Sequence, residues 1–216
     1  MDKITTDGLR MALLCAARQI IKSEPYLTEI DTIIGDGDHG SGMKTGFSAL
    51  EELLMGQQFQ SPYELLHASG LCLVRTMGGA SGVLFGTLFI GGLDQLQHTD
   101  WVTAQELVSF LEKGVKAIQT RGRAGPGDKT MLDALLPAAK AMTDELERSG
   151  DISGILREAH LAALEGVEKT KAMLPRTGRS KNFREKAIGY PDPGAISVSI
   201  LLQGLSEGVE QFSRGE

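Results

Sequence analysis

Aromatic residues and cysteines are scarce in this 216-residue chain. Phenylalanine, tyrosine and tryptophan together make up 5% of the residues, so leucine, isoleucine, valine, alanine and methionine must fill the core. The two cysteines, Cys15 and Cys72, both lie in apolar helical patterns. We expect them to be buried free thiols in a reducing compartment, because two cysteines do not form the disulfide framework of a small secreted domain.

Long apolar runs and basic stripes are also missing. No stretch of 18 apolar residues and no secretory-type apolar run occurs, so we expect neither a membrane span nor a signal peptide. The net charge is −6, and lysine and arginine are not interleaved with aromatics, so nucleic acid is not an expected partner. These features predict a soluble cytoplasmic protein without membrane attachment, whose residues 1–216 form a single domain.

Helical periodicity is abundant. Apolar residues recur at three- and four-residue steps, and no stretch shows convincing β alternation. The sequence therefore predicts an all-α bundle of about eight antiparallel amphipathic helices. Residues 83–90 are apolar on nearly all sides, which is typical of a helix in the middle of a bundle. The predicted helices cover approximately residues 5–23, 25–34, 41–55, 61–74, 83–90, 103–122, 132–142, 151–173 and 195–212.

Four connections between these helices are rich in glycine or charge: residues 35–42, 78–82, 122–130 and 176–194. In an up-and-down bundle every second connection lies at the same end. The four loops obey this alternation, so we expect them to meet at one end and the remaining connections to lie at the other.

The first loop and the helix end before it carry three carboxylates, Asp31, Asp36 and Asp38, that fall within eight residues. Gly35 and Gly37 make a continuous helix unfavourable, so the loop is expected to fold the later two aspartates back beside the first. Like charges this close raise one another's pKa, and a divalent cation would neutralise them. Oxygen ligands favour Mg²⁺ or Mn²⁺, and Mg²⁺ fills its other positions with water and phosphate oxygens. The stretch therefore predicts a magnesium–phosphate site, and by extension a magnesium–nucleotide site.

Other motifs fit this stretch less well. The spacing from Gly35 to Gly40 matches the dinucleotide fingerprint, but no β-α-β pattern follows and the aspartates would repel a pyrophosphate. A phosphate-binding P-loop would need a glycine directly before Lys44. An EF-hand starting at Asp36 would lack its central glycine and its final glutamate. An acidic surface loop that only caps a helix remains as the alternative.

The other three loops each leave two interpretations open. The small residues at 78–82 permit close approach of the backbone either to a ligand or to another helix. Lys129 and Thr130 could hold phosphate at a helix entrance, while Asp128 could equally be an ordinary N-cap. The basic stretch 176–194 is either a cationic flap over phosphates or a solvated loop.

Taken together, these motifs resemble the ADP-binding L subunit of dihydroxyacetone kinases, which is equivalent to the C-terminal nucleotide domain of the single-chain enzymes. The family usually has asparagine where this chain has Gly42, so only a main-chain N–H is offered there. The matching segments follow in the same order and are IGDGDHG at 34–40, GGASG at 78–82 with LFG at 84–86, GDKTM at 127–131 and DPG at 192–194.

The resemblance implies a closed barrel of antiparallel helices with ADP or ATP bound at one end. It implies two Mg²⁺ ions on Asp31, Asp36 and Asp38, and it makes Arg179, together with Asp36 and Asp38, catalytic. Met131 would lie against the adenine. The nucleotide contacts of the family fall on His39, Gly40, Ser41, Gly42, Ala80, Ser81, Gly122, Met131, Arg179, Asp192, Pro193 and Gly194.

The resemblance further implies a kinase subunit rather than a complete kinase. Dihydroxyacetone or a related keto-sugar would be held by a separate substrate-binding subunit, through a covalent bond to a histidine that this chain does not supply. The donor would be free ATP or a phosphohistidine protein of the sugar phosphotransferase system that recharges bound ADP in place, and a chain of only this domain favours the second. The alternatives are a regulatory Mg–ADP-binding module and a purely structural helical protein, and a homodimer remains open.

Overall fold

The computed structural model describes residues 1–215 and consists almost entirely of helices. Its elements are β1 (Lys3–Thr5), α1 (Thr6–Lys22), α2 (Glu24–Ile34), α3 (His39–Gly56), α4 (Pro62–Thr76), α5 (Gly79–Ile90), the 3₁₀ turn η1 (Leu93–Gln95), β2 (Trp101–Thr103), α6 (Ala104–Gly122), α7 (Leu132–Arg148), α8 (Ile152–Thr170), the 3₁₀ segment η2 (Arg179–Ala187) and α9 (Pro193–Arg214).

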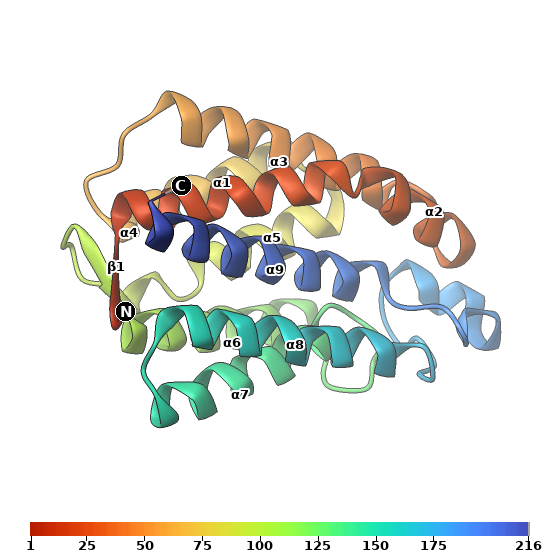
Figure 1. Ribbon diagram of the computed structural model, residues 1–216. Coiled ribbons are helices and arrows are strands. Elements are labelled where there is room, and N and C mark those ends of the chain that lie inside the picture. The colour runs from red at the N-terminus through yellow and green to blue at the C-terminus, as the bar shows by residue number, and fades with distance from the viewer. Residues whose placement is uncertain (216) are drawn as a thin grey trace.

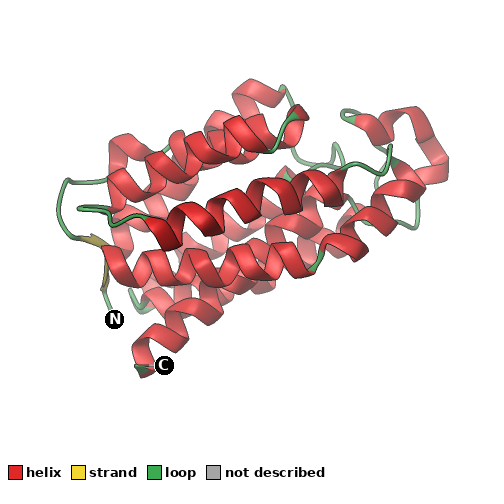
Figure 2. Ribbon diagram, turned by 90° about the horizontal axis from the view of Figure 1, so that it is seen from above, coloured by secondary structure: helices red, strands yellow, loops and turns green. Residues whose placement is uncertain are grey.

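The helices close into a barrel (Figure 1). α1 packs on α3, contacts continue in chain order from α3 through α9, and α9 returns to pack on α1. Figure 2 shows the helices lying along one common direction, with connecting loops gathered at the two ends. The apolar stripes of the helices face inward and form a single hydrophobic cluster within the described residues. The predicted all-α barrel of antiparallel helices is confirmed.

Local capping explains why several helices begin where they do. Thr5 accepts a hydrogen bond from the Gly8 N–H at the start of α1, and Thr103 and Glu106 form a complete capping box at the start of α6. α5 begins at Gly79, four residues earlier than its apolar pattern suggests, because Gly78 turns the chain with a φ of 67°. α3 likewise begins at His39, before the expected Ser41.

The start of the bundle differs from the predicted alternation. α2 continues beyond the end of α1 instead of folding back along it (Figure 1), because the two helices share a junction of one residue, Ser23. A single residue cannot reverse the chain direction. The connection between α1 and α2 therefore does not lie at the opposite end, and α1 with α2 acts as one bent rod of the barrel.

Three smaller expectations also need correction. Lys3–Thr5 and Trp101–Thr103 pair as a two-stranded antiparallel ribbon, too short for its alternation to be recognised in the sequence. α5 lies in the barrel wall between α4 and α6 rather than in the middle. Cys15 and Cys72 are free but only half-buried, and desolvation raises the pKa of each thiol.

The segment between α8 and the start of α9, residues 171–191, is called the flap below. It contains η2 and lies at the right-hand end of the barrel in Figure 1, drawn in light blue. In the described part of the chain, no helix combines the length and the apolar character needed to cross a bilayer.

Candidate functional site

A cavity of about 780 Å³ opens at one end of the barrel. Its lining comes from the loops that follow α2, α4, α6 and α8. These are the four loops that the sequence predicted to converge, so that expectation is confirmed. The convergence follows from the alternation of helix direction from α2 onward.

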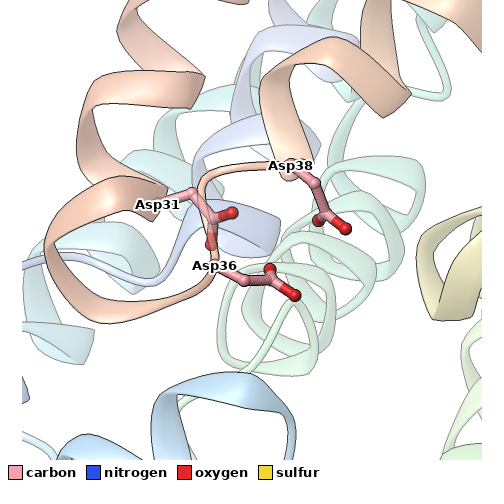
Figure 3. Close-up of side chains that lie close together, drawn as sticks. All are labelled: Asp31, Asp36 and Asp38. Carbon is pink, nitrogen blue, oxygen red and sulfur yellow. The ribbon is translucent and has the colours of Figure 1, made fainter.

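Three carboxylates of the cavity lining lie close together (Figure 3). Asp31 projects from the last turn of α2, and Asp36 and Asp38 follow in the loop before α3. One carboxylate oxygen of each residue lies within 4.8 Å of the others. The predicted folding-back of the loop is therefore confirmed.

Two glycines make this arrangement sterically possible. A Cβ at Gly35 would stand 2.1 Å from Asp31 Oδ1 and 2.9 Å from the Asp31 carbonyl oxygen, so a side chain at residue 35 would collide with Asp31. Gly37 adopts a φ of 76°, which L-residues with side chains rarely adopt. The loop can therefore pass directly over Asp31 only because both positions are glycine.

The charge of the cluster is only partly compensated. Asp31 is 6% exposed and accepts a hydrogen bond from the His39 N–H at 3.1 Å. Desolvation and the neighbouring Asp36 raise the pKa of Asp38. Arg179 reaches from the flap and places its Nη1 2.7 Å from Asp36 Oδ2. A divalent cation would neutralise the repulsion within the cluster, and clustered carboxylate oxygens suit a hard cation such as Mg²⁺.

Four helices begin at the rim of the cavity: α3, α5, α7 and α9. First-turn N–H groups lack partners within a helix, and the helix dipole favours anions at this end. At α5 the arrangement is most open, because Gly78 provides no side-chain cap and a Cβ at Gly78 or Gly79 would meet nothing within 4 Å. The first turn of α5, which includes Ala80 and Ser81, therefore offers N–H groups suited to a phosphate.

The small residues of this segment also serve packing. A Cβ at Gly82 would stand 3.1 Å from the Met77 Cβ, and one at Gly86 would stand 2.2 Å from a Val74 methyl. The two interpretations of the small-residue segment thus apply to different residues. The first two glycines face open space, and the later two let α5 lie close to α4.

His39 joins three parts of the site. Its Nδ1 lies 3.3 Å from Ser81 Oγ on α5, and its Nε2 lies 2.8 Å from Ser197 Oγ on α9. Burial lowers the pKa of the imidazole, which favours the neutral form. The sequence did not predict Ser197, although a serine within the buried face of an apolar helix was a signal that a polar partner must be near.

Part of the cavity lining is an apolar wall. Met131 is 5% exposed and lines the cavity with Leu84, Ile118 and Leu132. A Cβ at Gly194 would stand 3.3 Å from the Met131 Cβ, so the residue-194 backbone packs directly against this wall. Such a surface suits the face of an aromatic base.

Asp192, the N-cap of α9, also lines the cavity. Its Oδ2 accepts a hydrogen bond from the Ala195 N–H at 2.8 Å, as expected for the turn that precedes the last helix. Burial raises the pKa of Asp192 to about 7.

Almost every residue that the resemblance implicated lines the cavity. The exception is Gly40, which is buried against α2, where a Cβ would stand 2.2 Å from Thr28 Oγ1 and 2.5 Å from the Glu24 carbonyl oxygen. The implicated residues found in the lining are Asp31, Asp36, Asp38, His39, Ser41, Gly42, Ala80, Ser81, Gly122, Met131, Arg179, Asp192, Pro193 and Gly194.

In the loop before α7, Thr130 lines the cavity, but neither Lys129 nor Asp128 behaves as its alternative suggested. The Lys129 ammonium donates to two backbone carbonyls instead of pointing at open space for a phosphate. Asp128 does not cap α7, because its Oδ2 accepts from the Gly125 N–H within the loop. Asp133 instead holds the loop by accepting from the Gly127 and Thr130 N–H groups.

Comparisons with known proteins agree with this geometry. Residues 33–207 match the DAK2 domain family. The chain is 36% identical to the PEP-dependent dihydroxyacetone kinase ADP-binding subunit DhaL of Escherichia coli K12, over 84% of this chain and 86% of that one. It is 35% identical to the corresponding subunit of kinase 2 from Listeria innocua, over 89% of each chain.

A solved structure is similar as well. The dihydroxyacetone kinase from C. freundii in complex with AMP-PNP and Mg²⁺ superposes with a TM-score of 0.72 at 26% identity. The match covers 92% of this chain and 33% of that one, so the chain spans about a third of the length of that kinase. With its helical barrel, its carboxylate cluster and this similarity over most of its length, the chain belongs to the DAK2 domain family.

Proposed function

We propose that this chain is the nucleotide-holding subunit of a dihydroxyacetone-type kinase. It would bind ADP or ATP with Mg²⁺ and pass the γ-phosphoryl group to dihydroxyacetone or a related keto-sugar held on a separate subunit. The observation that carries the proposal is the meeting of three carboxylates, Arg179 and four helix starts around one cavity. The relatives named as ADP-binding kinase subunits and the AMP-PNP and Mg²⁺ complex support it.

Two parts of the cavity lining would divide the nucleotide between them. Asp31, Asp36 and Asp38 would hold two Mg²⁺ ions, which supply charge neutralisation and orient phosphate oxygens for in-line transfer. The first turn of α5 would donate N–H groups to the phosphates. Met131 and the apolar wall would exclude water from the adenine.

Arg179 would act on the transferring phosphoryl group. Its guanidinium already lies against Asp36, at the edge of the carboxylate cluster. A cation at this position would stabilise the charge that spreads over the phosphoryl oxygens in the transition state. Because the arginine is carried by the flap, its position depends on how the flap is held.

We further infer that a phosphohistidine protein recharges ADP in place. The curated relatives described above are named PEP-dependent and ADP-binding, which supports a nucleotide that stays with the subunit. The donor and the substrate-binding subunit would both approach the end of the barrel that carries the cavity. We place this exchange in the cytoplasm and assign it to residues 1–216 as one nucleotide-binding domain.

Mass spectrometry under native and denaturing conditions tests the proposal. Copurified ADP with two magnesium ions is expected in the unaltered protein and is expected to be lost in Asp36→Asn. Asp144→Asn makes the same chemical change at an exposed position on α7 outside the cavity, and it should keep the ligands. The native spectra also show whether two copies associate.

Reconstitution with the substrate-binding subunit and the phosphohistidine donor then separates the alternatives. Phosphoryl transfer that depends on this chain is the expected result. ADP binding without transfer would identify a regulatory module, and the absence of both would identify a structural helical protein.

A further inference from the structure

Lys129 is a buried charge that the proposed function does not use directly. The residue is 1% exposed, and its backbone adopts a left-handed φ of 59°. A lysine rarely takes this conformation, and it persists only where the surroundings fix it. The contacts of its ammonium group show what the residue holds together.

The Lys129 Nζ donates to the carbonyl oxygens of Thr170 and Tyr190, each at 2.6 Å. Thr170 is the last residue of α8, so its carbonyl belongs to the negative end of that helix. Tyr190 lies at the other end of the flap. One ammonium group therefore ties the two ends of the flap to each other and to the loop before α7.

Further hydrogen bonds close the same neck. The Gly189 N–H donates to the Lys171 carbonyl at 2.8 Å, and the Asp192 N–H donates to Thr170 Oγ1 at 2.9 Å. On the entering side, the Arg176 N–H donates to the Asp128 carbonyl at 3.1 Å. The neck is thus built around residues 128 and 129, which contact both arms of the flap.

The loop that carries Lys129 is held independently of this ammonium. Asp133 accepts from the Gly127 and Thr130 N–H groups at 2.6 and 2.8 Å, and Asp128 accepts from the Gly125 N–H at 2.8 Å. Removing the Lys129 charge should therefore release the flap while leaving the Met131 wall in place. The flap carries Arg179, whose guanidinium contacts Asp36.

We infer that Lys129 is a positioning residue for phosphoryl transfer, because its ammonium closes the neck of the flap and so fixes Arg179 over the carboxylate cluster. This inference rests on the proposed role of Arg179 in transfer. Because its ammonium is bound to two backbone carbonyls, the lysine acts through the arginine.

Kinetics of a double-mutant cycle test this coupling in the reconstituted kinase. Lys129→Met keeps an unbranched stem and removes the donors, and it should lower kcat on the order of 100-fold, as small misplacements of catalytic groups can. In an Arg179→Gln background the same change should alter kcat by no more than about twofold. The dissociation constant for Mg–ADP should change much less than kcat in Lys129→Met.

A matched control and a rescue sharpen the result. Lys140→Met removes an exposed lysine on α7, paired with Asp144, and should leave kcat unchanged. Propylammonium, which replaces the missing atoms of Lys129→Ala, should restore kcat, whereas potassium at equal ionic strength should not. A merely structural role would give neither non-additivity with Arg179 nor rescue of kcat.

Hydrogen exchange provides a readout that does not depend on kinase activity. In Lys129→Met the amides of Gly189 and Asp192 should exchange faster, while those of α4 should not change. If the unaltered protein transfers no phosphoryl group, the proposed function fails, and this exchange still decides whether Lys129 closes the neck.

Three results would overturn the inference. They are unchanged exchange at the neck, a kcat loss of equal size with and without Arg179, and failure of both Lys129→Met and Lys129→Ala to fold as judged by circular dichroism. The last counts against it because a local tie should not be required for the barrel to form.

Discussion

Removing one carboxylate from the cluster should have opposite effects with and without ligand. In Asp38→Asn, the repulsion between Asp38 and its two neighbours disappears, and so does its attraction to Arg179. The cluster oxygens lie within 4.8 Å of one another. A pair of unit charges at that distance interacts by about 0.9 kcal/mol at the dielectric constant of water, which suits the exposed Asp36 and Asp38.

The net change follows from these pairs. Two repulsions of at least this size are relieved, whereas the lost attraction to Arg179 is the weakest charge effect on Asp38, so the metal-free variant should be more stable by at least about 1 kcal/mol. For a chain of this length this corresponds to a rise in Tm of about 2–4 °C. With Mg–ADP at about 100 times its Kd, the unaltered protein should gain about 2.7 kcal/mol and the variant almost nothing, so the order of stability reverses.

Differential scanning calorimetry at pH 8 and low salt measures both effects after dialysis against a chelator. In about 1 M salt the advantage of the metal-free variant should vanish, because the screening length falls to about 3 Å. Asp144→Asn serves as the control and should show no gain without metal and a full shift with Mg–ADP. A metal-free Asp38→Asn that is less stable than the unaltered protein, or one that keeps the full Mg–ADP shift, would refute the reasoning.

Three other predictions concern different parts of the molecule. Gly42→Asn should change the stability by less than about 1 kcal/mol in thermal melting, because a Cβ at this position would meet only the Met77 carbonyl oxygen, at 3.6 Å. The same variant should bind Mg–ADP more tightly in calorimetric titration, and weaker binding would contradict this. Thr103→Ala should lose about 1–2 kcal/mol in urea unfolding, since it removes the capping box of α6, and a loss of only a few tenths would show that the cap is not needed. The pKa of Asp192 is about 7 in the folded state and near 3.8 when unfolded, so the folded state binds more protons between these values, and stability should fall as pH rises from about 4 to about 7. Asp192→Asn keeps an acceptor for the Ala195 N–H and should flatten that fall in urea unfolding at pH 5 and pH 8, whereas an identical pH dependence in both proteins would contradict the assignment.

Much of the barrel could be predicted because its determinants are local. The capping pair Thr103 and Glu106 fixes the start of α6 through contacts three residues apart. Apolar spacing fixes the inward stripe of each helix, and alternation of direction then brings the loops after α2, α4, α6 and α8 to one end. The alternation fails only between α1 and α2, because the single residue Ser23 between them is too short to reverse the chain.

The site divides in the same way. The sequence by itself determined the carboxylate cluster, because Asp31, Asp36 and Asp38 are neighbours in the chain and Gly35 and Gly37 permit a tight loop between them. Only the tertiary structure decided where Lys129 and His39 point. The two carbonyl partners of Lys129 lie 41 and 61 residues away in the chain, and Ser197, a partner of His39, lies 158 residues away. Such contacts depend on which helices become neighbours when the barrel closes.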